Sequence, residues 1–194
     1  MNRFAKGAIA GAAGIALLLS GAGSFALWNG TATAAAAGTV QSGTMTIGTN
    51  ATAGTWTVTH GASGPTTVNI ATFRAVPGDV LTFTQSVDIT ATGNDLSAVL
   101  AVDPTSIKAS TTVAPTASAE LATALKSGMT VSIGGTLPAG ITAGTGNTFN
   151  VTGATGTTTV PVIVTLPFDS TVTGLTAQGG VVDLTALAIT LTQK

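Results

Sequence analysis

The sequence predicts an all-β domain, a jelly-roll-like β-sandwich with one short inserted helix. Threonine makes up 39 of the 194 residues, and its branched side chain favours strands over helices. Short alternations of apolar and polar residues recur between Gly- and Pro-containing turns, as in sandwiches. Only 7% of the residues are charged, against about 25% in an ordinary soluble domain, which is atypical of a cytosolic enzyme.

The first 27 residues read as a signal peptide that forms an N-terminal helix. Arg3 and Lys6 precede an uncharged apolar run over 8–19, and small residues follow it. We expect cleavage between Ala26 and Trp28, so that the mature protein is secreted and leaves the membrane. The alternative is an uncleaved anchor, because the uncharged stretch just reaches spanning length at Trp28.

The mature chain is predicted to begin with a flexible N-terminal arm, 28–42, followed by one sandwich domain, 43–194. The arm is rich in Ala, Thr, Gly and Ser and has few bulky apolar residues with which to anchor itself in a core. Alternating patterns predict the strands of the domain at 44–49, 55–59, 68–73, 80–92, 96–102, 129–133, 149–151, 158–168 and 181–192.

Two of these strands carry specific expectations. In 80–92, Leu81, Phe83, Val87 and Ile89 point to the core, and the turn at 92–95 is expected to lead into 96–102 as a hairpin. In 158–168 the apolar residues share one face, and the prolines at 161 and 167 lie on the other. Because proline cannot donate to a ladder, this pattern predicts an edge strand.

One segment is predicted to be a helix of about two turns. Ser118 is expected to cap the helix, and Glu120 lies in its first turn. Lys126 lies in its last turn, and Gly128 is expected to end it. Leu121 and Leu125, four residues apart, form its apolar face.

The residues predict no catalytic, cofactor-binding or metal site. The chain has no cysteine, and its single histidine, His60, excludes a zinc site with two or three histidines. A Ser-His-Asp triad needs only one histidine, so the number of histidines does not exclude it. The position of His60 at a strand end nevertheless indicates an exposed turn residue. The aspartates lie mainly at turns and strand ends without the spacing of a calcium loop: Asp79, Asp88, Asp95, Asp103, Asp169 and Asp183.

Charge excludes nucleic acid as a partner. After removal of Arg3 and Lys6, the mature chain has four basic and seven acidic residues, a net charge of −3, and nucleic-acid binding requires a clustered basic face. The Thr-x-Thr pattern recurs along the chain, and a flat ladder of such pairs would match ordered water. Because the pairs are irregularly spaced, we expect no solenoid face and read threonine as an uncharged outward residue.

Three stretches together resemble exported matrix proteins of the TasA and camelysin type. The segment 21–29, followed by 42–47, resembles their signal-peptide junction and first strand. The segment 75–81 resembles their Pro-Gly-Asp turn, and 160–165 with 188–193 resembles their closing strands. The resemblance suggests the actinobacterial branch with the alternate-type signal peptide.

The resemblance implies a jelly-roll subunit that a dedicated signal peptidase cleaves and that assembles with itself into extracellular fibres or matrix. In that family the freed arm enters the sheet of the next subunit. Since 34–38 lacks bulky alternating side chains, donor-strand addition by the arm stays open. The alternatives are a monomeric surface or adhesin module and a camelysin-like metallopeptidase, although we predict that the protein is not an enzyme.

Overall fold

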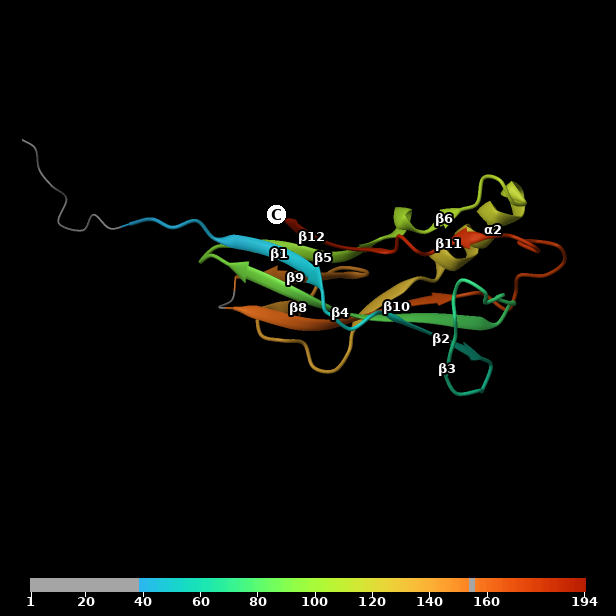
Figure 1. Ribbon diagram of the computed structural model, residues 1–194, viewed down its shortest axis with the longest axis horizontal. Helices are drawn as coiled ribbons and strands as arrows, with labels where there is room; N and C mark the ends of the chain where they lie inside the picture. Colours follow the sequence, from blue (N-terminus) through green and yellow to red (C-terminus); the bar gives the residue numbers. More distant parts are fainter. Residues whose placement is uncertain (1–38, 154–155) are drawn as a thin grey trace, which may run out of the picture. The chain divides into compact units, whose positions relative to one another are not determined.

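The strands form two stacked sheets and a small ribbon, which confirms the predicted all-β sandwich with one short α-helix among the described residues (Figure 1). This computed structural model describes residues 39–153 and 156–194. Its contacts separate Met1–Val40 from a compact unit, Gln41–Lys194. The predicted signal peptide, 1–27, and most of the arm, 28–42, lie outside the described residues.

The larger sheet, sheet A, is organised around one long strand. Its order is β3 (Thr66–Thr67), β2 (Thr55–His60), β4 (Asp79–Thr92), β10 (Thr157–Pro167) and β7 (Thr130–Ile133), and β1 (Thr44–Thr49) also pairs with β4. All the pairings are antiparallel. Since β2 pairs with the first half of β4 and β1 with the second, both occupy the same flank of β4.

The second sheet, sheet B, has the order β12 (Ala188–Gln193), β5 (Ser97–Asp103), β9 (Thr148–Thr152) and β8 (Ile141–Ala143). A short 3-10 turn, η1 (Pro104–Ser106), follows β5, and β6 (Lys108–Ala109) pairs with β11 (Val182–Asp183) as a ribbon. The predicted strand 68–73 is wrong, and the predicted strand 181–192 is wrong in extent. The segment 68–73 forms turns after the short β3, and 181–192 divides into β11 and β12.

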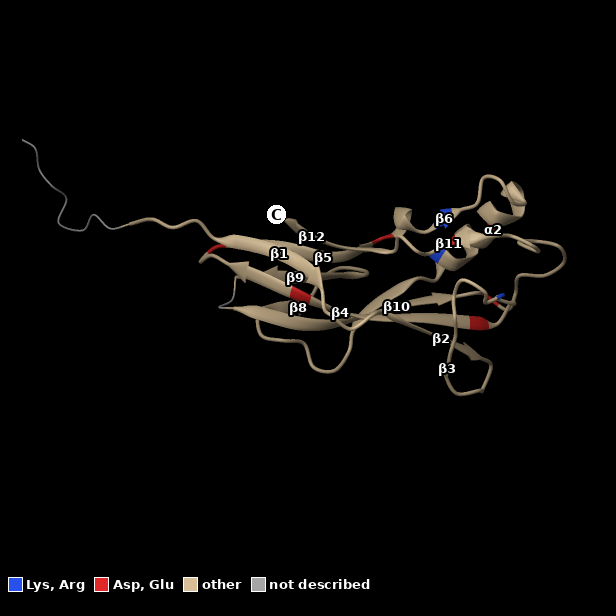
Figure 2. Ribbon diagram, viewed as in Figure 1, with Lys and Arg blue, Asp and Glu red and all other residues tan. Residues whose placement is uncertain are grey.

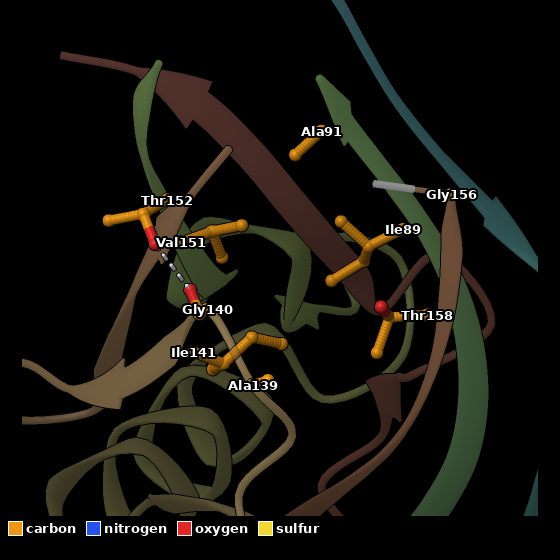
Figure 3. A pocket seen from close by; sticks show the side chains of 9 residues that line it. All are labelled: Ile89, Ala91, Ala139, Gly140, Ile141, Val151, Thr152, Gly156 and Thr158. Atoms are coloured by element: carbon orange, nitrogen blue, oxygen red, sulfur yellow. Dashed lines mark hydrogen bonds between the residues drawn. The ribbon is translucent and has the colours of Figure 1, made fainter. Parts of the chain in front are cut away.

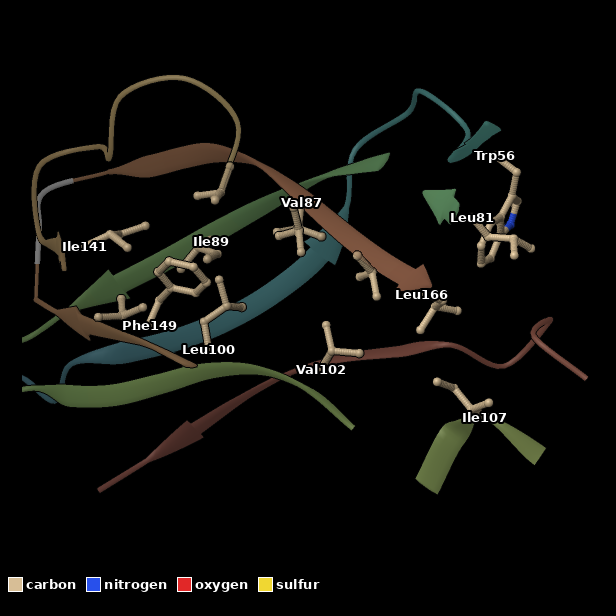
Figure 4. Packing of buried hydrophobic residues seen from close by; sticks show 14 of the residues in the cluster. Trp56, Leu81, Val87, Ile89, Leu100, Val102, Ile107, Ile141, Phe149 and Leu166 are labelled. Atoms are coloured by element: carbon tan, nitrogen blue, oxygen red, sulfur yellow. The ribbon is translucent and has the colours of Figure 1, made fainter. Parts of the chain in front are cut away.

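The core lies between the inner faces of the two sheets (Figure 4). Leu81, Val87 and Ile89 of β4 are inward and buried, as predicted. Phe83 has the same orientation but is only partly buried. The other strand residues of the core are buried residues of β2, β4, β10, β5, β9 and β8: Trp56, Ala91, Val160, Val162, Val164, Leu166, Ala98, Leu100, Val102, Phe149, Val151 and Ile141.

The predicted hairpin between β4 and β5 is wrong, because the turn carries the chain from sheet A to sheet B. Both strands have an apolar face, and these faces pack against each other across the core. The crossing is closely packed. A Cβ on Gly153 would lie 2.0 Å from the Gly93 carbonyl oxygen, and one on Gly43 would lie 2.1 Å from that of Thr92.

The prediction that 158–168 is an edge strand is also wrong, because β10 lies between β4 and β7. β7 pairs only with 162–165 of β10. The carbonyl of Pro161 accepts the Gly134 N–H. In a strand the backbone nitrogen and carbonyl of one residue face the same neighbour, so the nitrogen of Pro161 faces the side of β7 and not β4. The nitrogen of Pro167, an even number of residues further on, faces the same side. Both prolines thus lie just outside the stretch that needs donors.

The helix α2 (Pro115–Ser127) is longer than predicted and begins differently. Pro115 occupies the first turn, and Ser118, expected as the cap, is a fully buried residue inside the helix. Its hydroxyl donates to the Val113 carbonyl and accepts the Val181 N–H, at 2.7 and 2.9 Å. Glu120 lies beyond the first turn and accepts the N–H of Ala177. Gly128 ends the helix, as predicted.

Candidate interaction surfaces

His60 and Asp79 form a pair that links β2 to the start of β4. His60 Nδ1 lies 2.7 Å from Asp79 Oδ1, and the two residues are register partners. The His60 side chain is 59% exposed, as predicted for a strand end, whereas that of Asp79 is only 5% exposed. Asp79 Oδ2 accepts the Val76 N–H at 2.8 Å. The pair therefore fixes the turn before β4, and sequence reasoning missed it because it depends on the register of β2 and β4.

Three aspartates each bind a threonine two residues later. The Thr105 hydroxyl and N–H, at 2.7 and 2.8 Å from Asp103 Oδ1, hold the pKa of that carboxyl below its ordinary value. Thr185 lowers the pKa of Asp183 in the same way, and the backbone N–H of Thr171 is the main cause of the lowering at Asp169. These carboxylates stabilise turns. Across 39–153 and 156–194, no three His, Cys, Asp or Glu residues gather as a metal site.

The two seams between the sheets differ in size. The seam of β8 and β10 contains a cavity of about 10 Å³ lined by Ile89, Ile141 and Val151 among others (Figure 3). This is close to the minimum that holds one water molecule. The Thr152 hydroxyl donates to the Gly140 carbonyl at its border, so the two sheets are nearly closed there.

The opposite seam, beside β1 and β12, contains a groove of about 300 Å³. It lies beside the last residues of β1, at the gap along β4 before β2 begins, and Phe83 of β4 forms part of its wall. The Gln85 amide donates to the Thr52 carbonyl and fixes the loop beside it. The groove is mostly apolar and is lined by Ile47, Gly48, Thr49, Phe83, Gln85, Val87, Leu187, Ala188 and Ile189.

The sheet edges at these seams are unequally protected. Proteins block edge pairing with short strands, proline or charge. β7 and β8 have four and three residues, and the prolines of β10 border β7. β1 and β12 have six residues each and contain neither proline nor a charged side chain. The β1 and β12 edges are therefore the ones open to another strand.

Charged residues are sparse over the described strands (Figure 2). The described basic residues are Arg74, Lys108, Lys126 and Lys194. The positive charge of Lys126 helps to lower the pKa of Asp103, and that of Lys108 helps to lower the pKa of Asp183. They form no continuous basic surface, and this part of the chain offers no footprint for a polyanion.

The outer face of sheet A is covered mainly with threonine. The register aligns residues of five strands in one row, Thr67, Thr57, Thr82, Thr165 and Thr130. Although the Thr-x-Thr pairs are irregular in the sequence, pairing brings them together, so reading them only as separate outward residues was incomplete. Further outward threonines on this face are Thr44, Thr46, Thr55, Thr59, Thr84, Thr90, Thr92, Thr157 and Thr159.

Hydroxyl groups on this threonine face bond to each other across strands. Thr44 and Thr92 have Oγ1 atoms 2.8 Å apart, and so do Thr90 and Thr157. Asp88 is the only charged residue on the outward positions of these six strands. The Thr159 hydroxyl donates to its carboxylate at 2.6 Å. The face is therefore large, polar and almost neutral.

No protein-family model, curated protein or solved structure matches this chain. The resemblance to TasA- and camelysin-type proteins stays a prediction from the sequence. In the described segments, no helix is long and apolar enough to span a membrane.

Proposed function

We propose that this protein is an exported structural subunit that assembles with itself into extracellular fibres or matrix. The observation that carries the proposal is the pair of unprotected edges, β1 and β12, on either side of an apolar groove. An added strand would gain main-chain hydrogen bonds from an edge and place alternate side chains in the groove. Such a contact joins unlike surfaces and propagates without closing.

The N-terminal arm supplies the simplest donor. The described end of the arm, 39–42, has no secondary structure and is separated from β1 only by Gly43. Val40 is 98% exposed, so its apolar side chain is available to a partner strand. A β-branched residue in an extended segment suits insertion beside a strand. Few charges oppose such a contact, because β1, β12 and 39–43 are uncharged.

The test compares two forms of the protein. Mature chain from Trp28 to Lys194 is expected to form fibres visible by negative-stain microscopy, whereas a chain starting at Gly43 is expected to fold but form none. Folding of the shorter form follows from the compact unit beginning at Gln41, and circular dichroism checks it. The N-terminus of protein from the culture medium, expected between Ala26 and Trp28, tests export.

Two outcomes would contradict parts of the proposal. If the shorter form polymerises equally well, the arm is not the donor and assembly runs through another edge. If neither form polymerises at high concentration, the subunit reading is wrong and the monomeric surface module replaces it. Zinc content and casein cleavage, measured on the same mature protein, test the metallopeptidase alternative.

A further inference from the structure

The threonine face is a second surface of this protein that the edge-to-edge contact does not use. Edge pairing occupies β1 and β12 at one seam, whereas the threonine face covers the outside of sheet A from β3 to β7. A solvated face of this kind usually carries a substantial share of charged residues. Here Asp88 is the only charged residue at the outward positions of the strands, and Asn50 and Thr159 bond its carboxylate. The face therefore has little charge to repel a neighbour.

The chemistry of the face excludes several partners. A polyanion or an anionic lipid surface would require basic side chains, and the strands of this face contain none. Nucleic-acid bases stack on aromatic groups, but Trp56 and Phe83, the aromatic residues of these strands, point inward to the core. What remains is a neutral partner that presents hydroxyl and methyl groups.

The geometry distinguishes between two such partners, a crystalline surface such as ice and a second β-sheet. Neighbouring strands rotate by roughly 20–25° relative to each other, so an array five strands wide, β3-β2-β4-β10-β7, is not planar. A flat crystal face would meet only a few of the threonines at once. A second sheet has the same twist and the same spacing, and two twisted sheets pack face to face about 10 Å apart.

The size of the face fits a contact between proteins. Each outward residue occupies a cell of about 4.8 by 6.8 Å. The roughly twenty outward positions of the six strands then cover about 700 Å². Standard stable interfaces bury about 600–1,000 Å² on each partner, so the whole threonine face lies within the range of one.

We propose that the threonine face binds the same face of a second copy of this chain, related by two-fold symmetry. The threonine hydroxyls already bond in pairs at 2.8 Å across strands, which leaves each pair one donor and further acceptor capacity for the facing sheet. The methyl groups interdigitate between them. The contact extends the proposed function, because it joins fibres side by side, but it requires neither the arm nor the β1 and β12 edges.

The test uses the chain starting at Gly43, in which arm-dependent assembly is removed. Sedimentation equilibrium is expected to show a concentration-dependent dimer. Thr84 is exposed at the centre of the face on β4, and Thr84→Lys places two ammonium groups in the contact because symmetry repeats each residue. We expect dimer affinity to fall at least tenfold. Thr142→Lys, at an exposed position of β8 in sheet B, is the matched control and should leave the affinity unchanged.

A monomer at every concentration, or equal losses in Thr84→Lys and Thr142→Lys, would overturn the proposal. Thr82→Lys, one row along β4, provides a second variant if Thr84→Lys unfolds, and urea titration monitors the fold of each. Fibre formation by mature chain carrying Thr84→Lys separates the two proposals. Single, unbundled fibres support both contacts, whereas bundled fibres contradict the face contact while leaving the edge contact intact.

Discussion

Replacing Phe83 by alanine tests whether the groove at the β1 and β12 seam is open in solution. A fully buried phenylalanine costs about 3–5 kcal/mol when it is cut to alanine. Phe83 is partly buried and borders the groove, so the loss of burial should be roughly half of that range. Its ring also contacts Trp56, with centroids 5.0 Å apart and planes tilted by 37°, and such a pair is worth about 0.5–1.5 kcal/mol. We expect a total of about 2–4 kcal/mol.

Leu81→Ala is the comparison, because Leu81 lies two residues away on the same face of β4. Leu81 is only 3% exposed, so we expect a loss of about 3–4 kcal/mol. Both values come from urea unfolding, provided that the slope m is the same in each variant. A loss for Phe83→Ala that equals or exceeds the loss for Leu81→Ala would show that the groove is filled in solution and that the open seam is wrong.

Two further predictions concern the sheet crossing and the exposed carboxylates. Gly153→Ala should destabilise the fold by more than about 2 kcal/mol, since its Cβ would lie 2.0 Å from the Gly93 carbonyl oxygen; Gly48→Ala, with no atom within 4 Å, should change urea stability by under about 1 kcal/mol. Thr105→Val should raise the pKa of Asp103, measured by carbon NMR, because the hydroxyl that lowers it is lost; an unchanged pKa would contradict that cause. Because the folded-state pKa is depressed, the stabilisation by Asp103 is present above the ordinary carboxyl pKa and disappears as pH falls through the lowered value.

The alternation of threonine with apolar residues predicted most strands, because burial of one face leaves a clear pattern. Leu81, Val87 and Ile89 are inward as that pattern requires. The pattern fails where pairing partners decide the outcome. β4 and β5 would show the same alternation of apolar residues whether they paired as a hairpin or lay in two different sheets. Only the packing across the core decides between these two arrangements.

The candidate surfaces were less predictable than the strands. Pro161 and Pro167 indicated an edge, but β7 is so short that β10 lies in the sheet interior without needing donors at either position. The row through Thr57, Thr82 and Thr165 depends on the register of three strands that are distant in the sequence. The spacing of residues along the sequence does not predict which strands pair or which residues lie opposite each other.

The two hydrogen bonds between Thr44 and Thr92, called here the Thr44–Thr92 clamp, determine how β1 would respond to mechanical tension. Force applied through the arm enters the domain at Thr44, where the backbone N–H and the hydroxyl both bond to the Thr92 hydroxyl, at 2.9 and 2.8 Å. Tension along β1 loads its ladder to β4 in shear, so that the bonds share the force. Tension across the strand would break the ladder one bond at a time, starting at this clamp. A chain pulled by its arm along β1 is therefore held by the whole β1–β4 ladder, and the Thr44–Thr92 pair is the first part of that ladder to be loaded.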